Sequence, residues 1–265
     1  MLSGAIQLEM SDSIARIIMA RPEKHNAFDD VLIGELNDVF TRVGEDADIR
    51  VVVLQGEGKS FSAGADLGWM QRMADYSEAE NLEDARVLAE MMRRLNEIPK
   101  PTIARVQGAV FGGGVGLVAA CDIAIASECA NFCLSETRLG LIPSVISPYV
   151  VEAIGARASR RYFQTAERFS AEVARSLGLV HEVVPEQSLD DRIAELAAVL
   201  LDNGPAAMAA SKDLIRRVSS GPFDAEMIED TAQRIADIRV NDEGREGLAA
   251  FLEKREAAWR VMPKK

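Results

Sequence analysis

The sequence has few of the residues on which several common kinds of protein chemistry depend. It contains 3 cysteines and 2 histidines among 265 residues. No histidine lies near Cys121, Cys129 or Cys133 in the chain, so neither a disulfide framework nor a zinc pattern is predicted. We expect buried, inert thiols, because free cysteine is often a core residue. A Ser-His-Asp or Cys-His mechanism would have to use His25 or His181, which disfavours that kind of catalysis.

Long hydrophobic runs are also missing. No stretch of about eighteen apolar residues occurs, and the most apolar segment, Val106–Cys121, is interrupted by Gln107 and several glycines. The first residues show no charged start followed by an apolar block and a small-residue cleavage site, so no secretory signal is predicted. We therefore expect a cytoplasmic protein that does not bind membranes.

Basic residues are outnumbered by acidic ones. The 30 Lys and Arg against 42 Asp and Glu give a formal net charge of −12. Such a surface repels phosphate backbones and anionic lipid, and no basic stripe with interleaved aromatic residues is present, so nucleic-acid binding is disfavoured. A local basic patch for a phosphorylated ligand remains compatible with this charge. The 48% of hydrophobic and 27% of charged residues are typical of a globular protein.

Hydrophobic periodicity predicts an α/β region followed by a helical one. Short β-branched runs predict strands at Ile14–Met19, Val51–Leu54, Ile103–Val106 and Ile123–Ala126. Helical spacing predicts helices over Asp30–Val43, over Ser77–Glu97 with a Ser77–Glu80 capping box, from about Gly113, and over Leu248–Trp259. The period stays helical after about residue 188, so we expect a core over 1–190 and a C-terminal helical region over 191–265.

Three motifs carry possible chemistry: Phe61–Leu67, Val106–Gly116 and Ser135–Pro143. The first two place small residues where a backbone could approach a ligand closely. The glycine triplet in the second opens a helix, whose free N–H groups and positive dipole end favour a developing oxyanion. Glycines also serve tight turns, and the spacing fits neither a P-loop nor a dinucleotide fingerprint.

The third motif places the carboxyl group of Glu136 among apolar neighbours in the sequence. Such surroundings raise the pKa of a glutamate towards the range useful for proton transfer. The simpler alternative is a partly exposed glutamate on the edge of a strand.

The order and spacing of these motifs resemble the crotonase family, the enoyl-CoA hydratases and isomerases. The residues that carry the resemblance are Arg21–Ala27, Ala63–Asp66, Gly112–Gly114, Cys121–Ile123, Leu177–Val180 and Phe251–Arg255. The resemblance implies an α/β fold, a spiral of ββα repeats followed by a helical trimerisation region. It also implies a homo-oligomer, either a trimer or a dimer of trimers.

The resemblance further implies the roles of individual residues. The backbone N–H groups of Ala65 and Gly113 would form an oxyanion hole, and Glu136 would be the main acid/base. Binding of CoA would involve Lys24, Ala27, Ala63, Asp66 and Leu67, with Phe251 and Lys254 reaching the CoA of a neighbouring subunit. The substrate is then an acyl-CoA thioester, so no separate cofactor and no metal are expected.

The sequence departs from the family pattern at one catalytic position. Hydratases of this family hold water with two glutamates, and Gly116 stands where the first would be. The segment Ser144–Tyr149 is also altered, and the Ser144 amide occupies the place that helps to hold water. A single carboxylate can still hydrate a double bond, and it can equally move a proton between C2 and C4.

A finer resemblance links the sequence to bacterial hydratases of methylglutaconyl-CoA in leucine breakdown and of isohexenylglutaconyl-CoA in acyclic terpene breakdown. Those substrates carry a second carboxylate, for which Arg72, Arg138, Ser144 and Ser147 are candidate partners. On a strand, Arg138 would share a face with Glu136. The alternatives are a Δ3,Δ2-enoyl-CoA isomerase, an RNA-binding relative and an inactive scaffold.

Overall fold

The computed structural model describes residues 4–260, which fall into two compact units. The first unit holds the residues up to Ile98 together with Thr102–Ala194. The second holds Pro99–Pro101 and the residues from Glu195 on. The predicted boundary after residue 190 and the observed one after Ala194 both lie within helix α7 (Leu189–Leu201).

A six-stranded sheet forms the base of the first unit. Its spatial order is β1 (Ile6–Ser11), β2 (Ile14–Met19), β3 (Val51–Gly56), β4 (Thr102–Val106), β6 (Ile123–Ser127) and β9 (Glu182–Val184). Only the β1–β2 pair is antiparallel among these strands. The apolar run at the start of β3 is fully buried, as expected for a parallel strand covered on both faces.

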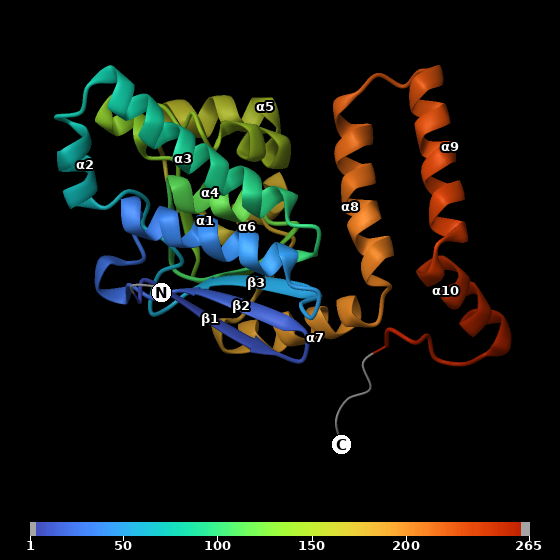
Figure 1. Ribbon diagram of the computed structural model, residues 1–265. Helices are drawn as coiled ribbons and strands as arrows, with labels where there is room; N and C mark the ends of the chain where they lie inside the picture. The colour runs from blue at the N-terminus through green and yellow to red at the C-terminus, as the bar shows by residue number, and fades with distance from the viewer. Residues whose placement is uncertain (1–3, 261–265) are drawn as a thin grey trace. The chain divides into compact units, whose positions relative to one another are not determined.

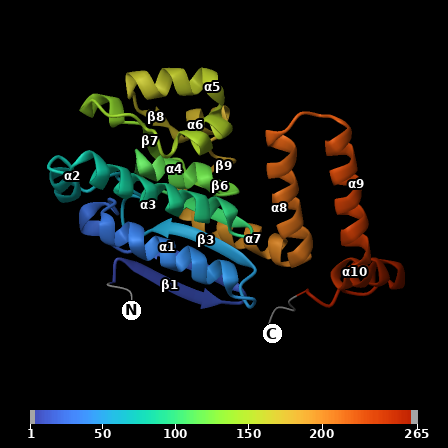
Figure 2. The ribbon, with the colours of Figure 1, turned by 45° about the horizontal axis from the view of Figure 1, so that its top comes forward.

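The helices of the first unit follow one another beside this sheet. Helix α1 (Asp30–Glu45) packs on α3 (Glu78–Glu97), α3 on α4 (Gly113–Ala120), and α4 on α5 (Ser147–Thr165), as Figure 1 and Figure 2 show. A second sheet joins β5 (Ala109–Phe111), β7 (Asn131–Cys133) and β8 (Phe169–Ser170). The short elements between them are η1 (Pro22–Lys24), α2 (Leu67–Met73), η2 (Glu136–Leu139), α6 (Ala171–Leu177) and η3 (Glu186–Ser188). The order strand, strand, helix recurs in β1–β2–α1, β4–β5–α4 and β6–β7–α5, whereas β3 is followed directly by α2 and α3. This recurrence agrees with the predicted spiral of ββα repeats.

The second unit contains α8 (Pro205–Ser220), α9 (Ala225–Val240) and α10 (Asp242–Glu253), each in contact with the other two. A last helix was predicted over Leu248–Trp259, and its bounds were wrong: α10 spans Asp242–Glu253. Helix α10 starts earlier because the side chain of Asn241 caps it through the amide of Gly244. It ends at Glu253, and the next residue, Lys254, has a left-handed backbone that stops the helix. Phe251 therefore lies inside the helix and Lys254 beyond its end.

Among residues 4–260, no single helix is long and apolar enough to cross a membrane. One bent pair of helices, Glu186–Leu201 with Pro205–Ser220, meets the length and composition criteria.

Asn26 ties the turn before α1 to the loop that follows β3. Its side chain is fully buried and donates to the carbonyls of Glu57 (3.0 Å) and Ser60 (2.8 Å), while its Oδ1 accepts from the Arg21 amide at 2.9 Å. The hydroxyl of Ser62 in turn donates to the Asn26 carbonyl at 2.9 Å. Asn26 has a φ of 53°, a conformation that asparagine adopts more readily than most residues. It therefore fixes the first of the three motifs in place.

We expect Asn26→Ala to lower the free energy of unfolding by about 2 kcal/mol, because the buried Ser60 carbonyl and two partly buried backbone groups lose their partner. Urea denaturation is the measurement. Asn81→Ala is the matched control: Asn81 also makes two backbone hydrogen bonds, but it is exposed. Its cost should stay within about 0.5 kcal/mol. Equal costs for the two variants would contradict the role assigned to Asn26.

Candidate active site

The three sequence motifs meet at Gly112. This glycine has a φ of 51°, and a β-carbon placed on it would lie 3.2 Å from Oε1 of Glu136 and 3.9 Å from the α-carbon of Gly64. Gly64, with a φ of 89°, also lies against the second motif. A β-carbon placed on it would lie 3.1 Å from the Phe111 carbonyl oxygen. Side chains at 64 and 112 would therefore separate the two loops and the carboxylate.

The residues that follow these two glycines carry unpaired amides. Phe28 bridges the first loop, because its N–H donates to the Gly64 carbonyl (2.6 Å) and its carbonyl accepts from Asp66 (2.7 Å). These two hydrogen bonds use the residues on either side of Ala65. The N–H of Ala65 itself has no acceptor within the described chain. The N–H of Gly113, the first residue of α4, likewise has none among residues 4–260. The two predicted oxyanion-hole donors thus flank the contact between Gly64 and Gly112.

Glu136 lies on the 3-10 turn η2 and not on a strand edge, which was the simpler alternative that the sequence left open. Burial raises the pKa of its carboxyl group above the usual range, and its Oε2 is buried without a hydrogen-bond partner in the described residues. Of the apolar sequence neighbours expected around Glu136, Phe132 and Leu134 are fully buried, whereas Leu139, Leu141 and Ile142 are exposed. The pKa shift has the predicted direction, and burial of the carboxyl group causes it.

Ile146 and Met92 fill the space beside Gly116. A β-carbon at residue 116 would lie 2.2 Å from Cγ2 of Ile146 and 3.1 Å from Cε of Met92. Gly116 stands one helical turn after Gly112, to whose carbonyl its amide donates. The two departures noted in the sequence, Gly116 and the altered segment Ser144–Tyr149, are therefore in contact. No second carboxylate can project from this turn of α4.

The residues predicted to bind CoA lie around the start of α2. Asp66 caps this helix by accepting from the amides of Gly68 (3.0 Å) and Trp69 (3.1 Å), and it pairs with Nζ of Lys24 at 3.0 Å. Burial acts to raise the pKa of Asp66, but these hydrogen bonds outweigh it and lower the pKa. Leu67 beside it is exposed, whereas Ala27 is buried. The amide of Ala63 donates to the carbonyl of His25 at 2.9 Å.

The predicted partners of a second substrate carboxylate are already engaged. Arg138 donates from Nη2 to the Ala166 carbonyl at 2.6 Å, and because η2 is a 3-10 turn, Arg138 does not share a face with Glu136. Arg72 pairs with Asp30. The Ser144 amide donates to Ile142, and the Ser147 hydroxyl donates to the Ser144 carbonyl.

The remaining predicted residues, Phe251 and Lys254, belong to the second unit and are exposed there. No group of three or more His, Cys, Asp or Glu side chains within residues 4–260 could hold a metal ion. Cys121 and Cys133 are buried as expected, but Cys129 is exposed.

Sequence reasoning did not assign Asn26, Ile146 or Ala166 a part in shaping the site. Asn26 lies in the Arg21–Ala27 motif and Ile146 in the altered segment Ser144–Tyr149, whereas Ala166 lies in none of the motifs.

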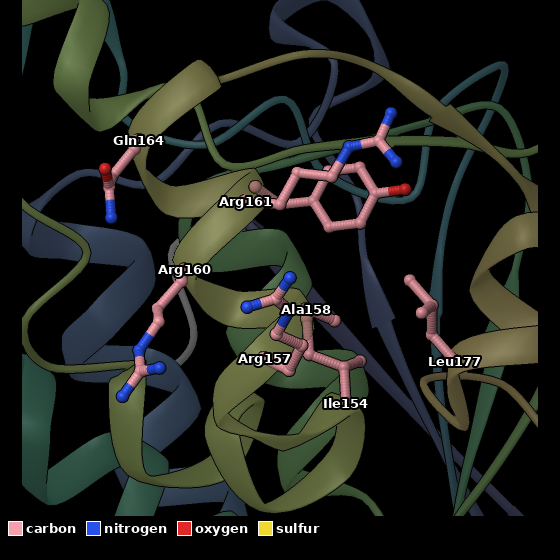
Figure 3. Close-up of a pocket in the computed structure, with 8 residues that line it drawn as sticks. Ile154, Arg157, Ala158, Arg160, Arg161, Gln164 and Leu177 are labelled. Atoms are coloured by element: carbon pink, nitrogen blue, oxygen red, sulfur yellow. The ribbon is translucent and has the colours of Figure 1, made fainter.

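A separate cavity of about 720 Å³ lies between α5 and α6 (Figure 3). Its lining includes Arg157, Arg160 and Arg161 of α5 and Leu177 of α6, and it contains none of the predicted site residues. It is therefore distinct from the place where the three motifs meet.

We expect Gly116→Ala to destabilise the protein by about 1–3 kcal/mol or more, because its β-carbon would overlap Ile146. The double variant Gly116→Ala/Ile146→Ala should be more stable than the sum of its two single variants implies. Gly34→Ala is the control, since Gly34 lies in α1 with no heavy atom within 4 Å of the new β-carbon. It should be neutral or stabilising by up to about 1 kcal/mol. Strictly additive costs in thermal unfolding would refute the contact.

Comparison with known proteins gives consistent matches. The chain matches the family described as Enoyl-CoA hydratase/isomerase over residues 9–261. It is 45% identical to an enoyl-CoA hydratase from Shewanella pealeana of known structure, with a TM-score of 0.94 over 96% of each chain. It is 36% identical to hydroxycinnamoyl-CoA hydratase-lyase from Pseudomonas fluorescens, over 80% of this chain and 78% of that protein. It is 30% identical to a mitochondrial Delta(3,5)-Delta(2,4)-dienoyl-CoA isomerase from Dictyostelium discoideum, over 95% and 89%.

Proposed function

Because the chain belongs to the enoyl-CoA hydratase/isomerase family, we propose that it adds water to the C2–C3 double bond of a 2-enoyl-CoA thioester. One observation carries the proposal. The buried, unpartnered carboxyl oxygen of Glu136 belongs to a side chain that touches Gly112, directly before the unpaired amide of Gly113. An acid/base group and oxyanion donors at one place are what this addition requires.

In the proposed reaction, Glu136 performs both proton transfers. Its carboxylate takes a proton from water while the water oxygen attacks C3, and the C2–C3 π electrons move to the thioester oxygen as an enolate. The N–H groups of Ala65 and Gly113 stabilise that negative charge. Glu136 then returns the proton to C2 as the enolate collapses. Water is consumed, and the enzyme regains its starting protonation state.

For the acyl group, we propose a substrate with a second carboxylate, of the 3-methylglutaconyl-CoA or isohexenylglutaconyl-CoA type. Arg72 is the cation best suited to meet it. Its ion pair with Asp30 is half-exposed, with side-chain exposures of 50% and 58%. Exposed pairs contribute little stability, so Arg72 can exchange partners at small cost. The hydroxyl groups of Ser144 and Ser147 would be further donors.

Isomerisation is the second candidate function. A single carboxylate suffices for it, and one relative is named as a dienoyl-CoA isomerase. The two reactions differ in their products. Incubation with 2-enoyl-CoA and 3-enoyl-CoA thioesters in deuterated water, followed by NMR, distinguishes a 3-hydroxyacyl product from a shifted double bond.

We expect Glu136→Gln to lower kcat by about 10²–10⁴-fold on 2-enoyl-CoA thioesters, because the amide keeps the shape but cannot transfer the proton. The wild-type rate should fall as the pH drops through the raised pKa of Glu136, since the ionised carboxylate starts the reaction. Loss of the conjugated thioester absorbance measures both effects. Exposed Glu128 provides the control substitution, Glu128→Gln, which should keep the wild-type rate and pH profile.

The same pKa shift predicts a difference in stability. The folded protein holds the Glu136 proton over a pH range in which the unfolded chain has lost it, so the shift makes wild-type stability fall as pH rises through that range. Glu136→Gln lacks this dependence.

Activity within about threefold of wild type for Glu136→Gln would remove Glu136 from its proposed role.

We further propose that the chain forms a trimer or a dimer of trimers. The second unit exposes large apolar side chains in the single chain, including Phe223 (88%), Phe251 (81%) and Leu252 (77%). Exposed apolar surface of this kind is typical of an interface between proteins. Lys254, at the end of α10, would then reach the CoA of a neighbouring subunit.

Light scattering should give a mass of three or six chains, and Phe251→Glu should reduce it, because a charge would be buried in the interface. Lys254→Ala should raise KM more than it lowers kcat, since it removes binding far from the reacting atoms. A fully active monomer at micromolar concentration would defeat both expectations.

A further inference from the structure

The carbonyl oxygen of Ala166 receives two donors from the segment that carries Glu136. Arg138 donates from Nη2 at 2.6 Å and Cys133 from Sγ at 3.2 Å. Ala166 is buried and has a left-handed backbone with a φ of 48°, at the position that ends α5. The two donors stand on either side of Glu136 in the sequence. One fixed carbonyl therefore holds both ends of this segment.

The turn that carries Glu136 has little stability of its own. Helix η2 has four residues and no side-chain cap, and so short a 3-10 segment depends on tertiary contacts. The carbonyl of Cys133 accepts from the Gly112 amide at 2.9 Å, which ties the same segment to the start of α4. Arg138 and Cys133 thus link the Glu136 turn to the end of α5 and to the loop at Gly112.

We propose that Arg138 is a positioning residue for Glu136 and not a ligand of the substrate carboxylate. The guanidinium makes a charge-assisted hydrogen bond, which is stronger than one between neutral groups. Without it, the buried Ala166 carbonyl keeps only the thiol of Cys133, a weak donor. The η2 turn would then loosen, and the Glu136 carboxyl group would lose its fixed place beside Gly112. The kinetic part of this inference rests on the proposed function.

The test compares Arg138→Met, Arg138→Lys and the control Arg160→Met on two substrates. Crotonyl-CoA lacks a second carboxylate, and 3-methylglutaconyl-CoA has one. A positioning role predicts that Arg138→Met lowers kcat by about 10–100-fold on both substrates, as small misplacements of catalytic groups do. KM should stay within about threefold, and Arg138→Lys should recover part of the rate. Arg160 is exposed on α5 and has no part in the site, so Arg160→Met should match wild type.

A substrate-binding role predicts the opposite pattern. KM would then rise on 3-methylglutaconyl-CoA alone, with crotonyl-CoA unaffected, and this result would overturn the proposal. Unchanged kinetics on both substrates would overturn it as well. If Arg138→Met does not fold, Cys133→Ala tests the same carbonyl from the other side, and the same fall in kcat on both substrates is expected.

A second readout does not need activity. The pKa of Glu136 is measured by infrared difference titration, with the Glu136→Gln variant as the reference. We expect Arg138→Met to lower this pKa towards the ordinary glutamate value, because a loosened turn admits water, and Arg160→Met to leave it unchanged. An unshifted pKa in Arg138→Met would contradict the positioning role. Wild-type protein that is inactive on every enoyl-CoA would refute the proposed function and leave this readout standing.

Discussion

Close approach of three backbone segments at Gly112 is the constraint on which the rest of the site depends. The loop after β3, the start of α4 and the η2 turn come from distant parts of the chain, and they touch where residues 64 and 112 lack side chains. The sheet order places the ends of β3 and β4 next to each other. The parallel strands bring the loops together, and the glycines decide how close they come.

The site contains polar groups that the fold leaves unpaired. Two backbone amides and a carboxyl oxygen there have no partner within the described residues, and each such group costs stability when it is buried. Other polar side chains that contact the same loops do make hydrogen bonds. Gln107, for example, donates to the carbonyls of Gly56 (2.6 Å) and Gly58 (3.2 Å). Such hydrogen bonds hold the loop after β3 in place beside the unpaired groups.

The sequence predicted those parts of the fold that depend on local pattern. The strand β2, the helix α1 and the capping box of α3 follow from spacing within a few residues, and the structure has all three. The 3-10 turn at Glu136 could not be predicted in this way, because a short apolar segment does not distinguish a turn from a strand. The partner of Arg138 was equally out of reach, since Ala166 offers its carbonyl only once α5 has ended beside η2.

The contact between Gly116 and Ile146 restricts the order in which this site could have changed or could change again. A chain that acquired a side chain at 116 first would pass through an intermediate with two atoms 2.2 Å apart. Shortening residue 146 first leaves only a cavity, which costs about 2–5 kcal/mol, and many domains survive such a loss. To gain a side chain at 116 without this overlap, the chain must shorten residue 146 first; to lose it again, residue 116 must become glycine before residue 146 regains its size. The two positions are therefore coupled in evolution, and the order in which they can change depends on the direction of the change.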